Sequence, residues 1–172
     1  MSISVPHIVV VLIAGIACLS DIRTGRIPNL LTFGAAAAAL VYLFASRGWP
    51  GLAEAIEGWA VGVLLFAPFF ALGGLGAGDV KLLGALGAWI GPRETLWVAL
   101  YASMAGGVMA LIVALATGYL RRAVANLRTL ITYWLVVGIR PMPELTLAGG
   151  HAPSLPYAVP MAAGLLVMLW LQ

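Results

Sequence analysis

Charged residues are scarce in this chain, and cysteine and aspartate are nearly absent. Of its 172 residues, 9% are charged and 63% are hydrophobic, and the mean hydropathy is +1.07. A soluble domain has about 25% charged residues, so the composition excludes a soluble enzyme and predicts an integral membrane protein. The single cysteine, Cys18, excludes an internal disulfide and a cysteine-rich zinc module.

The sequence also predicts no metal, no other cofactor and no nucleic-acid partner. Its two histidines, His7 and His151, fall on opposite sides of the expected membrane, and no His-Glu-x-x-His spacing occurs. The net charge of +3 lies in short loops between apolar runs. Membrane orientation explains such loops better than a nucleic-acid ligand does, so the expected environment is the lipid bilayer.

Apolar runs separated by charged or Gly/Pro-rich breaks predict an all-α membrane bundle of about six transmembrane helices, in a single domain covering residues 1–172. The mixed stretch 119–153 contains an apolar segment, Leu127 to Ile139, for which an interfacial helix and an extra span are both open. Because Arg128 and Arg140 bracket only about 11 residues, we favour the interfacial helix. The expected spans are 4–20, 29–46, 54–73, 80–92, 95–118 and 154–171.

The basic residues predict the orientation, because cytoplasmic loops of membrane proteins carry an excess of Lys and Arg. If the loop after the first span is cytoplasmic, only Arg47 and Arg93 of the nine basic residues lie outside. Both chain termini and the acidic residues Glu54, Glu57 and Glu94 are then expected outside. The basic residues expected inside are Arg23, Arg26, Lys81, Arg121, Arg122, Arg128 and Arg140.

Asp21 and Asp79 are the only aspartates of the chain. They follow the first and third spans, so both are expected at the cytoplasmic border of the membrane. Singly, Asp79 could cap a helix and Asp21 could end one in the headgroup layer. Acids at such positions usually face the bundle interior and have a function. As a pair they predict aspartyl-protease chemistry, in which two nearby carboxyls share a proton, activate water and protonate a peptide carbonyl.

The glycine-rich stretch Gly73-Gly-Leu-Gly-Ala-Gly-Asp79 leads into the second aspartate. Gly76 and Gly78 are expected to bind substrate, because they lack side chains that would obstruct its backbone. A phosphate-binding loop would need a Gly-Lys-Ser/Thr ending, which this stretch lacks. Lys81 and Arg23, each two residues after an aspartate, are interpreted as surface anchors and more weakly as charges that keep one aspartate ionised.

Two of these motifs resemble those of the type IV prepilin peptidases. Gly76-Ala-Gly-Asp79-Val-Lys81 is similar to the Gly-x-Gly-Asp-x-Lys motif of that family, and Asp21-Ile-Arg23 with Ile27-Pro28-Asn29 is similar to its other aspartate motif. Leu155-Pro156-Tyr157-Ala158-Val159-Pro160 resembles the Pro-Tyr motif near the last span, with Ala158 where Gly is common.

The resemblance implies a membrane aspartyl endopeptidase with Asp21 and Asp79 as its catalytic pair. Such enzymes remove the basic leader from prepilin and pseudopilin precursors at the cytoplasmic face of the inner membrane. Longer members carry an N-terminal domain linked to N-methylation. Because the chain starts in its first span, we expect the short, Flp or tight-adherence type without methyltransferase activity.

Three other interpretations were weighed. A presenilin-like or signal-peptide-peptidase-like protease would hold its aspartates within longer helices of a larger bundle. A small proton-coupled carrier would show paired halves or helices broken at mid-membrane depth. A non-catalytic pilus or secretion assembly protein would carry both aspartates incidentally. The sequence leaves the oligomeric state open.

Overall fold

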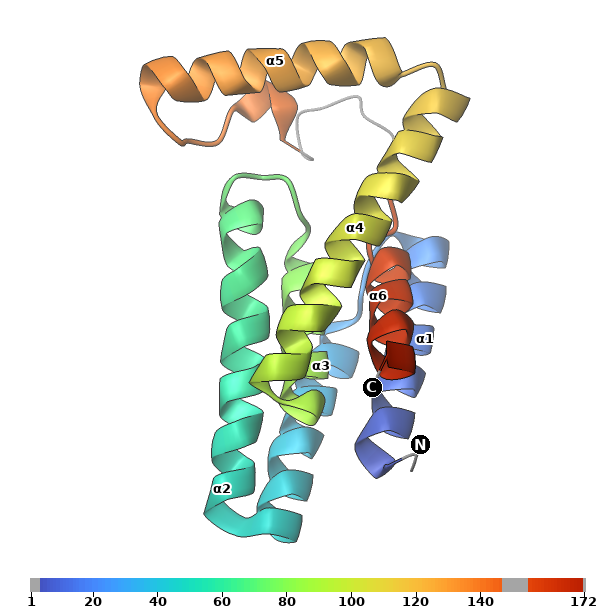
Figure 1. Cartoon of the computed structure of the whole chain (residues 1–172), viewed down its shortest axis with the longest axis vertical. Coiled ribbons are helices and arrows are strands. Elements are labelled where there is room, and N and C mark those ends of the chain that lie inside the picture. Colours follow the sequence, from blue (N-terminus) through green and yellow to red (C-terminus); the bar gives the residue numbers. More distant parts are fainter. Residues whose placement is uncertain (1–3, 147–154, 172) are drawn as a thin grey trace.

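The computed structural model describes residues 4–146 and 155–171, and every regular element in this part of the chain is a helix (Figure 1). This confirms the all-α prediction. Three helices, α1, α2 and α4, are long and apolar enough to cross a membrane, and α6 is a shorter apolar helix. The elements are α1 (Val5–Thr24), α2 (Asn29–Ala71), α3 (Ala77–Ile90), α4 (Pro92–Ala116), α5 (Leu120–Val137), the short 3₁₀ helix η1 (Pro143–Leu145) and α6 (Ala158–Leu171).

Two of the expected spans, 29–46 and 54–73, both lie in α2, which folds back on itself (Figure 1). The reversal occurs at Gly48, whose backbone has φ 65° and ψ −148°. A side chain is strongly disfavoured at such positive φ, so glycine suits this position. Across the turn, Arg47 forms a 2.7 Å ion pair with Glu54. Both side chains are largely exposed, so this pair contributes little stability.

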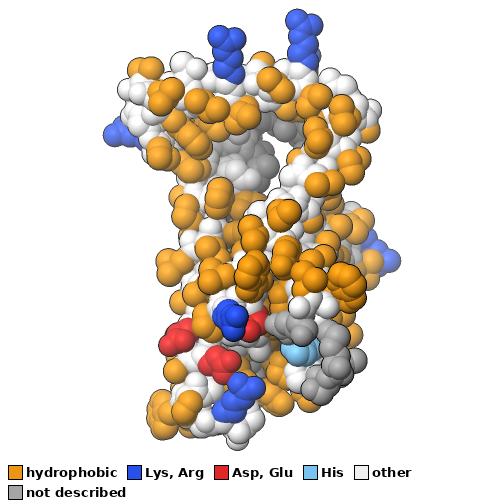
Figure 2. All heavy atoms as spheres, viewed as in Figure 1, with side chains coloured by type: hydrophobic (Ala, Val, Ile, Leu, Met, Phe, Trp, Pro, Cys, Tyr) orange, Lys and Arg blue, Asp and Glu red, His pale blue; other side chains and the backbone are white. Residues whose placement is uncertain are grey.

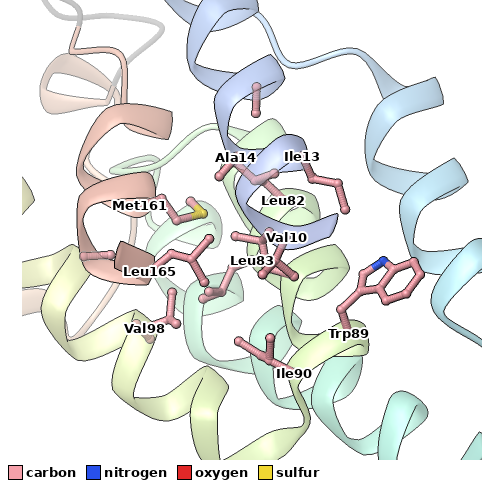
Figure 3. Close-up of a cluster of buried hydrophobic side chains, with 14 of the residues drawn as sticks. Val10, Ile13, Ala14, Leu82, Leu83, Trp89, Ile90, Val98, Met161 and Leu165 are labelled. Carbon is pink, nitrogen blue, oxygen red and sulfur yellow. The ribbon is translucent and has the colours of Figure 1, made fainter. Parts of the chain in front are cut away.

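Helix α3 is the centre of the bundle. It packs against α1, α4, α6 and the two halves of α2 that flank Gly48. Its residues from Leu82 to Ile90 are all buried. Figure 3 shows their side chains meeting those of α1, α4 and α6. Because protein surrounds α3 on all sides, 14 residues suffice here, whereas a helix that crosses lipid needs about 20.

Glycines bring α2 and α3 into backbone contact. A Cβ atom at Gly58 would fall on the carbonyl oxygen of Gly87, and one at Gly62 would lie 2.6 Å from the carbonyl oxygen of Leu83. Small residues at one-turn spacing allow such close approach between membrane helices. Close helix packing is therefore the role of Gly58, Gly62, Gly84 and Gly87.

The end of the bundle opposite α5 carries acidic side chains (Figure 2). Gly91, with φ 85°, makes the tight turn from α3 into α4, close to the break between the expected spans 80–92 and 95–118. Glu54 and Glu94 both lie against this turn. They are thus at the opposite end of α3 from Asp79, as expected. The start of α1 and the end of α6 lie at this same end (Figure 1).

Helix α5 lies across the other end of the bundle, crosswise to the remaining helices (Figure 1). It begins at Leu120, earlier than the expected segment 127–139, and has no buried residue. Basic side chains project from it away from the bundle (Figure 2). This is the orientation that an interfacial helix requires. Its exposed apolar stripe consists of Val124, Leu127, Ile131 and Leu135.

We expect Gly58→Ala to lower the free energy of unfolding by about 1–3 kcal/mol, because the added methyl group forces α2 away from α3. The matched control is Gly34→Ala, also in α2, where a Cβ meets nothing within 4 Å. That change should be neutral or stabilising by up to about 1 kcal/mol. Thermal unfolding in detergent measures both variants. Equal midpoints for the two would contradict the proposed backbone contact.

Candidate active site

Asp21 lies in the last turns of α1, on the same face as the buried residues Val10, Ala14 and Ala17. This face points into the bundle, so the carboxylate is directed inward rather than toward lipid. Its Oδ2 atom accepts a hydrogen bond from the backbone N–H of Ala158, the first residue of α6, at 3.2 Å. A helix N-terminus favours a negative charge, so the start of α6 is a suitable partner for this carboxylate.

Asp79 is the third residue of α3 and lies in its first turn. Its Oδ2 atom accepts a hydrogen bond from the backbone N–H of Gly76 at 3.2 Å, the geometry of a capping box. The helix-capping role considered from the sequence is therefore present. It does not occupy the whole carboxylate, because only Oδ2 is used in this bond.

The two carboxylates lie at the same end of the bundle and interact electrostatically. Asp79 lies in the first turn of α3, just before the buried apolar residues that begin at Val80 and ahead of the expected span 80–92. Burial, and next the negative charge of Asp21, raise the pKa of Asp79 from 3.8 to about 6, against the opposing effect of the Gly76 hydrogen bond. A carboxyl whose pKa is raised by a neighbouring acid holds its proton to a higher pH, which is the condition for the two carboxyls to share one proton.

Tyr157 and Ala158, at the start of α6, complete the site. Neither is among the site residues that the sequence predicts. The ring of Tyr157 meets Phe66 edge to face with centroids 5.8 Å apart. Its hydroxyl lies beside that of Ser103 and within electrostatic reach of Asp79. The Cys18 thiol donates to the carbonyl oxygen of Ala158 at 3.1 Å. The sequence indicated this region only through the Pro-Tyr motif. It could not indicate the bond between Ala158 and Asp21, because the donor is a backbone N–H.

The glycines before Asp79 have packing roles in this structure. Gly73 has φ 77°, and a Cβ atom there would clash with Thr146, which follows η1. A Cβ at Gly78 would lie 3.2 Å from Cβ of Ile27. Gly78 thus packs closely against Ile27, and the expected binding of substrate by Gly76 and Gly78 stays a prediction. Gly76 is the N-cap of α3, and its own N–H binds Asp79.

Lys81 does not pair with either aspartate. Its ammonium group donates to Oδ1 of Asn29 at 3.0 Å and lies 5.2 Å from the centre of the Phe33 ring. Lys81 therefore links the start of α3 to the start of α2. Arg23 is exposed at the end of α1, which suits a surface anchor.

Within residues 4–146 and 155–171, no group of three or more His, Cys, Asp or Glu side chains is placed to hold a metal ion. His151 lies outside the described residues, so its expected separation from His7 stays a prediction.

The fold and the site define a class: a helical membrane bundle with one carboxylate from each of two helices at the same end. The profile of the type IV leader peptidase family matches residues 8–111. This match covers more than half of the chain and includes both aspartates, and the chain belongs to this family.

Curated relatives agree with this assignment. A type 4 prepilin-like proteins leader peptide-processing enzyme of Escherichia coli O78:H11 is 33% identical over 103 residues, which are 56% of this chain and 38% of that protein. A prepilin leader peptidase/N-methyltransferase of Burkholderia pseudomallei is 36% identical over 100 residues, covering 54% and 32%. The enzyme of that name from Myxococcus xanthus is 33% identical over 121 residues, covering 66% and 36%. The matches thus span about a third of the length of these relatives. No solved structure matches significantly.

The raised pKa of Asp79 predicts a pH-dependent stability. The folded state favours the protonated form of Asp79. The stabilisation that this group adds to the free energy of unfolding is therefore complete below pH 3.8 and is lost as the pH rises to about 6. Asp79→Asn removes this loss while still accepting the bond from Gly76. Between pH 4 and 7.5, the variant should therefore gain up to about 3 kcal/mol relative to the parent.

Thermal unfolding of both proteins across this pH range measures the effect. Glu57→Gln, which changes an exposed carboxylate at the other end of the bundle, is the control and should show no such trend. If the difference in unfolding free energy between Asp79→Asn and the parent stays constant from pH 4 to 7.5, the raised pKa of Asp79 is refuted.

Proposed function

We propose that the protein is a membrane aspartyl endopeptidase that removes the basic leader from prepilin or pseudopilin-like precursors. The observation that carries this proposal is the pair of inward-directed carboxylates at one end of the bundle, close enough for the charge of Asp21 to raise the pKa of Asp79. Membership in the type IV leader peptidase family supports the same reaction. The names of the curated relatives, which refer to prepilin leader processing, agree with it.

In the proposed mechanism, Asp21 and Asp79 share one proton. The ionised carboxylate takes a proton from a water molecule as its oxygen attacks the scissile carbonyl carbon, and the protonated carboxyl donates to the carbonyl oxygen. The tetrahedral intermediate then loses the amine as the C–N bond breaks and the nitrogen is protonated. The carboxyls thus perform different halves of one acid–base exchange, so both are required.

The proposed reaction takes place at the cytoplasmic face of the inner membrane. Seven of the nine basic residues fall at the end that bears Asp21, Asp79 and α5 by the predicted topology, and an excess of basic residues marks cytoplasmic loops. A precursor with a basic leader before an apolar helix would then place its cleavage point at the depth of both carboxylates. The apolar stripe of α5 would lie in the membrane surface beside them.

The carrier and assembly-protein alternatives are less favoured. A proton-coupled carrier places its ionisable groups near mid-membrane depth at helix breaks, whereas Asp21 and Asp79 lie at the ends of α1 and α3. A scaffold does not require a carboxyl with a raised pKa beside a second acid, although structural carboxylates can also have shifted pKa values.

Replacing either aspartate with asparagine should abolish cleavage, with a loss of at least about 100-fold, because each variant lacks one of the two acid–base groups. The assay is the size shift of a co-expressed Flp-type prepilin in membranes. Glu57→Gln serves as the matched control and should cleave like the parent. Near-normal cleavage by Asp79→Asn would rule out this mechanism. Failure of a well-folded parent on several prepilins would favour the carrier or scaffold alternatives.

A further inference from the structure

We propose that Tyr157 is a positioning residue that holds the start of α6 against Asp21 and so sets the geometry of the two carboxylates. This inference rests on the proposed function, because it concerns how the same carboxylates reach their working arrangement. It follows from contacts that join the start of α6 to α1, α2 and α4.

The start of α6 is a direct partner of α1. The backbone N–H of Ala158 donates to Oδ2 of Asp21 at 3.2 Å. The carbonyl oxygen of the same residue accepts a bond from the Cys18 thiol at 3.1 Å. Asp21 and Cys18 lie one turn apart on α1, so one residue, Ala158, is bound through both its N–H and its carbonyl oxygen by one turn of this helix. A displacement of Ala158 therefore changes the position or the solvation of the Asp21 carboxylate.

Tyr157 determines where Ala158 lies. The Tyr157 carbonyl oxygen accepts the N–H of Met161 at 3.2 Å, so its backbone takes part in the first turn of α6. Its ring is held between Phe66 of α2, with centroids 5.8 Å apart, and Gly106 of α4. The hydroxyl end lies beside Ser103, whose own hydroxyl donates to the carbonyl oxygen of Ala99 at 2.7 Å. The ring is thus a wedge between two helices, and Ala158 follows it directly in the chain.

The contact with Gly106 is close. A Cβ atom there would lie 2.9 Å from Cε2 of the Tyr157 ring, which is too near for van der Waals contact. At the next residue, Gly107, a Cβ atom meets nothing within 4 Å. Two adjacent glycines of one helix therefore provide a matched pair of substitutions, of which only one displaces the ring and neither changes a polar group of the site.

The first experiment compares Gly106→Ala with Gly107→Ala in the full chain, using prepilin cleavage in proteoliposomes. We expect Gly106→Ala to lower kcat by about tenfold or more with KM changed less than about threefold, because small displacements of reacting groups reduce the rate rather than substrate binding. Gly107→Ala should match the parent. Equal kcat values for the two variants, or a change confined to KM, would overturn the inference.

The second experiment needs no activity. Cys18 is the only cysteine of the chain, so its labelling rate with a maleimide reports whether the bond to Ala158 is intact. We expect at least about threefold faster labelling in Gly106→Ala than in Gly107→Ala, because the freed thiol becomes more accessible. Equal labelling rates would refute the link between the ring and α6. Failure of the parent to cleave prepilins would instead refute the proposed function, so the two failures are distinguishable.

Substitutions of Tyr157 itself distinguish the contribution of its aromatic ring to kcat from that of its hydroxyl group. Tyr157→Phe keeps the wedge and should retain kcat within about threefold of the parent, whereas Tyr157→Leu should lose about tenfold or more. Tyr101→Leu, which removes an aromatic ring stacked on Trp97 elsewhere in α4, is the control and should not alter kcat. If Tyr157→Phe loses as much as Tyr157→Leu, the hydroxyl acts on the substrate directly and the positioning role is wrong.

Discussion

The burial of α3 is the constraint on which the rest of the structure depends. From Leu82 to Ile90 this helix exposes no residue substantially, so α1, α2, α4 and α6 must surround it. Its partners can approach that closely only where side chains are absent, as at Gly58 opposite Gly87. Dispersion contacts and close packing, rather than the hydrophobic effect, hold such helices together in lipid. The glycine content of the chain is therefore a packing requirement.

The same constraint shapes the candidate site. Asp79 lies in the first turn of α3, just before the fully buried part of the helix. The position of this carboxylate is therefore set by the packing of α3 itself. Asp21 is placed differently: α1 directs it inward, and its hydrogen bond comes from the start of α6. The two carboxylates are thus supported by separate elements. Their geometry depends on how α6 is held, which gives Tyr157 its importance.

Much of the helix arrangement was predictable, and the differences have physical causes. The breaks at Gly48 and Gly91 could be predicted because each lies beside proline and charged residues in a strongly apolar chain. Helix α5 begins earlier than expected because Arg121 and Arg122 lie on the polar face of an amphipathic helix and do not end it. Gly78 packs against Ile27, a contact that has no local signal in the sequence, and its expected binding of substrate stays a prediction.

The sequence by itself determined the membrane class, the helical architecture and the two candidate carboxylates, because composition and apolar run length reflect the cost of exposing polar groups to lipid. Only the tertiary structure decided how the candidate site is supported. The bonds from Ala158 to Asp21 and from Cys18 to Ala158 join residues about 140 positions apart. The first donor is a backbone N–H and the second acceptor a backbone carbonyl, which every non-proline residue possesses. A hydrogen bond to a backbone group does not require a particular residue type at that position. It can therefore be identified only in the tertiary structure, where packing brings the helices together.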